Sequence, residues 1–373
     1  MHLVQLCHSM PYISTTYIPL PSSGPLNDLP QELIEHIMLQ VQSPSDLKVV
    51  MRTCNAMRQL VSSPDFQAAW LCNMYGPQNA MSEAMSLCHS PHLVIRKLID
   101  VHHSDINGVL PSCLGEELSI LSFACLSNHP AAPDVVQLLL RMKEIGMKQI
   151  NKMGSITTLQ GICSYTPLHL AVESKNAVVV RMLLKHPGID VNKKALGASE
   201  DTVMHMAILS QPYAQDLDPR IRLTIVRELL MHPGIDVNLP DQMGCTALHY
   251  AVSIGDIDIL TALLQHEGID VNILHIYGHG ILPFAARFGR LDVIEALLCC
   301  PQLDRGQFPA AILRAREFGH ASAIALIQKQ AVLAVVPEGA HPNRERQAKR
   351  GREEDSVPVS SRSRSRGKPT MSR

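Results

Sequence analysis

The sequence predicts an all-α protein built mainly from a stack of repeated helix pairs, and two recurring patterns indicate this fold class. A heptapeptide of the form His-Pro/Glu-Gly-Ile-Asp-Val-Asn occurs three times, at 186–192, 232–238 and 266–272. A hexad of the form Thr-x-x-His-x-Ala also occurs three times, starting at Thr166, Thr202 and Thr246. Clusters that recur every few dozen residues indicate a stacked array, and such arrays bind other macromolecules.

Each hexad has the features of a short helix at its start. Thr166 can cap the first turn, and Pro167 takes a position where the missing N–H costs nothing. Leu168 and Ala171 lie three residues apart on one helical face, where the small Ala lets helices approach closely. A degraded copy spans Gly280–Ala285, so the spacings are 36, 44 and 34 residues. The unequal spacings predict lengthened loops, with the largest insertion at 211–220.

A second helix is expected behind each hexad. The Gly of the heptapeptide should end this helix through a left-handed residue, with Ile-Asp-Val-Asn leading into a turn. We expect clear repeats at about 160–300 inside an array spanning 79–336. The second-helix runs are Val178–Leu184, Ile225–Leu230, Ile257–Leu264 and Val293–Leu298, and weaker copies include Ala84–Ile106, Ser119–Leu140 and a closing helix at Ala321–Val336.

The hexads and their period resemble ankyrin repeats, whose signature is Thr-Pro-Leu-His-x-Ala with a period of roughly 33 residues. The resemblance implies a concave binding strip formed by turn tips and by the exposed side of the first helices. Aromatic and Arg side chains are common interface anchors, which favours the fourth clear repeat, although these side chains could instead pack beneath the next repeat. Carried over by position, the substrate-binding residues are Gln242, Met243, Ile254, Tyr277, His279, Arg287 and Phe288.

The segment 26–72, ahead of the array, predicts three short helices. Pro30 begins the first, whose apolar residues Leu33 and Ile37 follow helical spacing. Pro44 opens the second helix, and Ser63-Pro64 ends the third. Some forty residues in three helices form a marginal core, so the segment needs a partner, either the array or another protein.

This segment resembles an F-box. The resemblance rests on the opening Leu29-Pro30-Gln-Glu, on Asp46-Leu47, and on Ser63-Pro64 followed by Trp70; it departs at Met57, where the family commonly has an aromatic residue. It implies that Leu29, Pro30, Leu33 and Ile37 dock onto the Skp-family adaptor of a Skp–cullin–F-box ubiquitin ligase, while the repeats hold an unknown protein substrate. The alternative is an ankyrin-repeat interaction scaffold, without a ligase role, whose first helices cap the array.

Catalytic and metal sites are not expected. His169, His205 and His249 occupy the motif position, where the ring is expected to bond loop backbone between repeats. His186 and His232 stand at helix ends, where a cation suits the helix dipole. No Gly-rich phosphate loop, Ser/His/Asp arrangement or zinc-type spacing is visible, so no cofactor or metal is predicted, and an enzyme would need an unrecognised site.

Composition and charge complete the expectations. The net charge is −1, but residues 338–373 hold ten Lys/Arg against five Asp/Glu. We expect a disordered basic Ser/Arg tail at 337–373, with a possible nuclear-import signal at 344–368, and a flexible segment at 1–25. Scattered cysteines and the lack of a long apolar run indicate a cytoplasmic or nuclear protein, in a host cell if the source is a virus or intracellular bacterium. Without aromatics in the basic clusters, nucleic-acid binding is not expected.

Overall fold

The computed structural model describes residues 35–335, except 37, 52–54, 112–116, 143–146, 159–160, 198, 210–218 and 276–277. The predicted adaptor-docking residues Leu29, Pro30, Leu33 and Ile37 lie outside the described residues. So do Tyr277, the segment 1–25 and the tail at 337–373. Among the described helices, none is long and apolar enough to cross a membrane.

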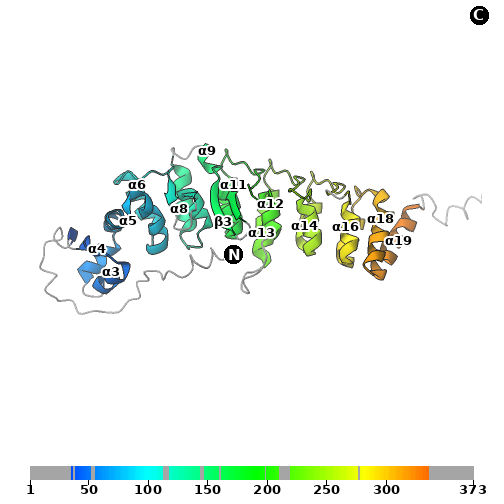
Figure 1. Cartoon of the computed structure of the whole chain (residues 1–373), viewed down its shortest axis with the longest axis horizontal. Helices are drawn as coiled ribbons and strands as arrows, with labels where there is room; N and C mark the ends of the chain where they lie inside the picture. Colours follow the sequence, from blue (N-terminus) through cyan, green and yellow to red (C-terminus); the bar gives the residue numbers. More distant parts are fainter. Residues whose placement is uncertain are drawn as a thin grey trace, which may run out of the picture.

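Seven helix pairs stack in one row through the described part of the chain (Figure 1). First helices pack on the first helices of neighbouring pairs, and second helices pack on second helices. The four clear repeats and the three weaker ones therefore all form helix pairs. The pairs are α5 (Pro64–Leu87, second half) with α6 (Pro91–Asp100), α7 (Ile120–Leu126) with α8 (Ala132–Arg141), α10 (Pro167–Glu173) with α11 (Ala177–Leu184), α12 (Val203–Leu209) with α13 (Pro219–Leu230), α14 (Ala247–Ile254) with α15 (Ile257–Leu264), α16 (Ile281–Phe288) with α17 (Leu291–Leu298), and α18 (Phe308–Glu317) with α19 (Ala321–Val335).

The hexad forms the start of each first helix as predicted. Thr166 caps α10, because its hydroxyl accepts a hydrogen bond from the backbone N–H of His169 while the His169 ring accepts one from the N–H of Thr166. Such a reciprocal arrangement satisfies two amide groups that the helix cannot pair internally. Leu168 and Ala171 are fully buried on the face that meets the neighbouring first helices. Most of the predicted insertion at 211–220 lies outside the described residues, and its last two residues begin α13 (Pro219–Leu230).

The Asn that ends each heptapeptide joins consecutive repeats. Asn192 donates from Nδ2 to the carbonyl of Gly234 at 2.8 Å and accepts at Oδ1 from the N–H of Asp236 at 2.9 Å. Asn238 makes the same two bonds one repeat further on, to Gly268 and Asp270. Because these bonds span 30 to 44 residues, one amide side chain per repeat sets the register of the stack.

The Gly of the heptapeptide plays a different part from the one predicted. Gly234 does not adopt a left-handed conformation; instead its N–H donates to Nδ1 of His232 at 3.1 Å. A Cβ at position 234 would lie 3.3 Å from the His232 ring, so the glycine makes room for that ring.

A small sheet corrects the all-α prediction, and the fold is mostly helical. Hairpins between repeats form β1 (Val109–Pro111), β2 (Glu117–Ser119), β3 (Gly154–Thr158) and β4 (Gly161–Tyr165), in the order β1-β2-β3-β4 with antiparallel neighbours. Strands of three to five residues are too short for their alternation to stand out in the sequence. The short helix α9 (Met147–Ile150) precedes β3.

The helices before the array form a unit at its end, with α3 (Pro44–Met51) and α4 (Asn55–Ser62) beside the first half of α5 (Figure 1). The Trp70 indole, 2% exposed, donates from Nε1 to the carbonyl of Val41 at 2.8 Å and so ties α5 to the chain before α3. Gly76 interrupts α5 with φ 78° and ψ 161°. The break separates the half of α5 that packs with these helices from the half that begins the array.

Candidate protein-binding surface

The exposed ends of the first helices carry three apolar residues in equivalent positions. Ile254, Phe288 and Phe318 each precede a left-handed glycine that follows the first helix of a pair. Ile254 is partly buried, whereas Phe288 is 38% exposed and Phe318 is 47% exposed. The exposed apolar surface of this row therefore grows toward the C-terminal end of the array.

The structure places most of the predicted binding residues on accessible surface. Gln242 and Met243 are exposed at a turn tip, and Arg287 and Phe288 are exposed at the end of α16. His279 is partly buried, in the loop before α16. Ile254 fits the alternative in which a predicted binding residue packs against the next repeat. Its side chain is partly buried, and its carbonyl accepts a hydrogen bond from Arg290.

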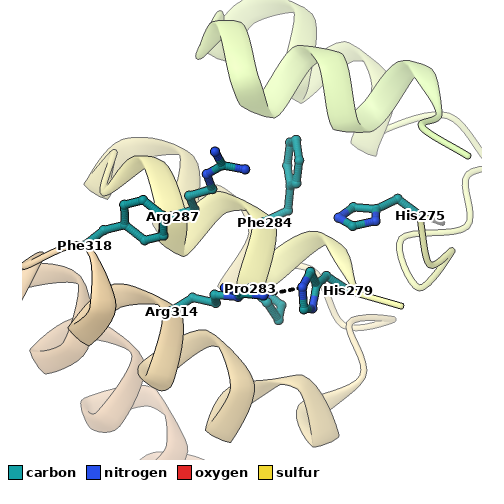
Figure 2. A pocket seen from close by; sticks show the side chains of 7 residues that line it. All are labelled: His275, His279, Pro283, Phe284, Arg287, Arg314 and Phe318. Atoms are coloured by element: carbon teal, nitrogen blue, oxygen red, sulfur yellow. Dashed lines mark hydrogen bonds between the residues drawn. The ribbon is translucent and has the colours of Figure 1, made fainter. Parts of the chain in front are cut away.

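A pocket of about 260 Å³ lies along α16 and α18, and we call it the Arg–Phe groove (Figure 2). It brings together two of the predicted residues, His279 and Arg287, with five that the sequence-based prediction missed. The sequence did contain a sign of one of these, Phe318, because Arg316-Glu-Phe-Gly319 resembles the pattern of Arg287-Phe-Gly289. The lining residues are His275, His279, Pro283, Phe284, Arg287, Arg314 and Phe318.

The two arginines of the groove differ in their surroundings. Arg314 donates from Nη2 to Nε2 of His279 and from Nη1 to Oε2 of Glu317 at 2.8 Å, so both its position and part of its charge are taken up. The Arg287 guanidinium lies 5.4 Å from the ring centre of Phe318, in cation–π geometry. Among the described residues Arg287 forms no ion pair, which leaves its charge available to a partner.

Aromatic rings form the inner wall of the groove. The Phe284 ring packs edge-to-face against His249, His275 and Phe288, with centroid distances of 5.4, 5.7 and 5.4 Å. Burial lowers the pKa of His275, and the neighbouring His279 ring, Arg314 and Arg287 lower it further. At neutral pH His275 is therefore an uncharged ring, and the positive charge of the groove comes from its arginines.

The motif histidines lie inside the array rather than on this surface. Nε2 of His169 lies 3.3 Å from the carbonyl of Asp201 in the next loop, the inter-repeat bond that the sequence predicted. Burial lowers the pKa of His169 to about 4 and that of His249 to about 4. Within the described residues no three His, Cys, Asp or Glu side chains are grouped as metal ligands.

The Arg–Phe groove offers positive charge, aromatic rings and hydrogen-bond donors, which suit recognition of another molecule.

Comparison with known proteins identifies the array. A family model for ankyrin repeats matches residues 84–195 and 220–306 in three copies, which is more than half of the chain. The chain belongs to the ankyrin-repeat family. A search of curated proteins finds no match to this ankyrin-repeat chain.

Several solved ankyrin-repeat structures resemble the chain. The ankyrin repeat domain of Bcl-3, described as a unique member of the IkappaB protein family, is 24% identical; the alignment has a TM-score of 0.45 and covers 56% of this chain and 85% of that one. An ankyrin repeat domain from Acinetobacter baumannii AYE is 21% identical, with a TM-score of 0.42 and 57% and 97% of the chains covered. The ankyrin repeat protein EF0377 is 21% identical, with a TM-score of 0.36 and 44% and 80% covered.

Membership of this family gives the groove its context. Ankyrin repeats are protein-interaction modules, so the chain presents a protein-binding scaffold whose exposed first-helix ends and turn tips are available to a partner. The family model for ankyrin repeats covers α16 but ends at residue 306, before α18 begins. The Arg–Phe groove therefore combines a recognised repeat with a terminal helix pair that the family model does not match.

Proposed function

We propose that this ankyrin-repeat protein is the substrate-recognition subunit of a Skp–cullin–F-box ubiquitin ligase. In this proposal the N-terminal helical unit docks onto a Skp-family adaptor, and the array binds the target protein. The observation that carries the proposal is the helical unit that packs on the first half of α5, at one end of the array and before the break at Gly76 (Figure 1).

Packing within this unit supports a docking role. Leu47 of α3 is 2% exposed and Met38, before α3, is 1% exposed, and both belong with Trp70 to the apolar core that continues into the array. Val49, also on α3, is 61% exposed. An exposed apolar side chain beside a formed core is the type of anchor that an adaptor surface can cover.

The expected mechanism involves no bond chemistry in this chain. Binding the adaptor at one end and the target along the array would hold target lysines near the ubiquitin-conjugating enzyme that the ligase recruits. Tethering of this kind raises the effective concentration of the two reacting groups, to the millimolar range for short connections. The separation between the α3–α4 unit and the Arg–Phe groove at the far end of the array leaves room for both partners at once (Figure 1).

A pull-down with a purified Skp-family adaptor tests the proposal. The wild-type chain is expected to retain the adaptor, and the double variant Leu29→Ala/Pro30→Ala and the variant Val49→Asp to lose it. Val332→Asp is the matched control, because Val332 is an equally exposed valine (66%) on α19, at the opposite end of the array. Circular dichroism of each variant checks that the array remains folded.

The ankyrin scaffold without a ligase role is the competing interpretation. It predicts that the wild-type chain retains no adaptor, and this result would overturn the adaptor proposal and leave the first helices as a cap on the array. Equal retention by Val49→Asp and Val332→Asp would instead remove Val49 from the docking surface.

A further inference from the structure

The loop before the fourth clear repeat has His275 where the loop before the third has Asp241, and His275 lines the groove. In the third, the Asp241 carboxylate accepts the Tyr250 hydroxyl at 2.5 Å and the N–H groups of Met243 and Cys245 at 2.8 and 2.7 Å. Thirty-four residues later His275 and Phe284 stand in place of Asp241 and Tyr250. Two backbone hydrogen bonds are equivalent in the two loops, since Gly278 donates to the carbonyl of residue 275 as Gly244 does to that of residue 241, and residue 275 donates to residue 279 as residue 241 does to residue 245. The later loop keeps these bonds but has an imidazole where the earlier loop has a carboxylate.

The next helix pair adds positive charge to the same place. Arg314 of α18 occupies the position that Phe284 holds in α16 and Tyr250 in α14, counted from the glycine after each first helix. Glu317 is the acidic residue beside the groove, and it pairs with Arg314 at 2.8 Å. With His275 uncharged, the groove keeps the charge of Arg287 without a counter-ion among the described residues.

An apolar surface adjoins this charge. Phe318 and Phe288 are 47% and 38% exposed, and the Phe318 ring stacks against Arg287 (Figure 2). A guanidinium stacked on a ring keeps its edge N–H groups free, and these groups can clamp a carboxylate through two parallel hydrogen bonds. One guanidinium and two half-exposed rings fit a ligand that combines a carboxylate with an apolar side chain.

The size of the pocket favours side chains of a peptide over a free small molecule. Its 260 Å³ is below the roughly 300–1,000 Å³ of typical small-molecule sites. The pocket lies along α16 and α18, so a longer chain can continue over the neighbouring repeats.

We propose that the Arg–Phe groove binds an acidic peptide segment of the target protein, with a Glu or Asp carboxylate on Arg287 and a neighbouring aromatic or aliphatic side chain on Phe318 and Phe288. This inference rests on the proposed role of the array as the target-binding surface, and it names the chemistry of the target. With His275 at the position that Asp241 holds in the preceding repeat, the groove lacks a carboxylate there that would repel such a segment.

Fluorescence anisotropy with the full-length chain tests this inference. The probe is a fluorescein-labelled dodecapeptide containing four Glu and two Phe separated by Gly and Ser, and the comparison peptide has Gln in place of each Glu. The wild-type chain is expected to bind the Glu peptide at least about tenfold more tightly than the Gln peptide. The difference should shrink as salt rises, because ion pairs at an exposed site are screened.

Two variants and a control assign the binding to the groove. Arg287→Gln and Phe318→Ala are each expected to weaken binding of the Glu peptide by about tenfold, as loss of an interface anchor does. Arg316→Gln is the matched control, because Arg316 is an exposed arginine on the neighbouring helix α18 that does not line the pocket. It removes one positive charge, as Arg287→Gln does, and should leave binding within about twofold.

Three outcomes would overturn the inference: no binding of the Glu peptide, equal binding of the Gln peptide, or an equal loss in Arg316→Gln and Arg287→Gln. The peptide measurement contains no Skp-family adaptor, so its result is separate from the pull-down. Peptide binding without adaptor binding would leave the groove standing and remove the ligase role, whereas the reverse would remove only the groove.

Discussion

At the residue scale, the buried motif histidines link the stability of the array to pH. His169 and His249 are 0% and 2% exposed, and burial holds their pKa values at about 4, against an ordinary 6.5. The unfolded chain therefore binds more protons than the folded chain between these values. The stability from these neutral rings is fully present above pH 6.5 and is lost as pH falls toward 4, on the order of 3 kcal/mol for each ring.

The first prediction follows from this linkage. The urea midpoint of the wild-type chain is expected to fall as pH is lowered from 7 to 4. His249→Asn should be less stable than wild type at pH 7 but lose less on acidification, because it lacks one of the buried motif rings, whose pKa values burial lowers. His103→Asn replaces an exposed histidine and should keep the wild-type slope. A wild-type midpoint independent of pH in this range would contradict the argument.

At the element scale, the break in α5 determines how the N-terminal unit meets the array. Gly76 has φ 78° and ψ 161°, a region that residues with a Cβ avoid. Pro77 follows, and a proline also disfavours helical backbone at the residue before it. The carbonyl of Pro77 accepts a hydrogen bond from Ser104 at 2.8 Å, which anchors the second half of α5 to the loop after α6.

The second prediction isolates this backbone requirement. Gly76→Ala is expected to lower the free energy of unfolding by about 1–3 kcal/mol. The added Cβ meets nothing within 4 Å, so the loss reflects conformation rather than a clash. Gly234→Ala is the comparison, since Gly234 is not in the left-handed region; its Cβ would lie 3.3 Å from the His232 ring, a contact that a small shift of that side chain relieves, so its loss should be smaller. Urea denaturation measures the free energy of unfolding of both variants. Equal losses would refute the argument that the backbone at the α5 break requires a glycine.

At the scale of the whole molecule, each helix pair contacts its sequence neighbours along the row, so stability is expected to be nearly one-dimensional (Figure 1). Each internal pair supports two neighbours, whereas α18 and α19 support one. The Arg–Phe groove depends on that terminal pair, because Arg314 and Phe318 both belong to its segment.

The third prediction compares two buried isoleucines. Ile225→Ala in α13 and Ile327→Ala in α19 remove side chains that are 2% and 0% exposed, each at a cost of about 2–5 kcal/mol. Hydrogen exchange is expected to show faster exchange confined to α16–α19 for Ile327→Ala. For Ile225→Ala it should rise in the pairs on both sides of α13. Loss of protection along the whole chain in both variants would mean that the array unfolds as one cooperative unit.

The helix pairs could be predicted from sequence because their determinants are local. Thr166, Pro167 and Ala171 act within one helix, and the period of the hexads follows from the length of one repeat. Arg287 and Phe288 are exposed at the end of α16, before the left-handed Gly289, and their role in binding stays a prediction. The adaptor residues such as Leu29 stay a prediction, since they lie outside the described residues.

The sequence by itself determined the repeats, their helix pairs and the position of the exposed helix ends, because propensity, capping and hydrophobic period act over a few residues. The tertiary structure alone decided which side chains share a surface. Arg314 bonds to His279, 35 residues earlier in the chain. The hairpin β3–β4 pairs with the preceding hairpin β1–β2 through its strand β3. Such contacts depend on how consecutive repeats stack, and no local pattern in the chain records that geometry.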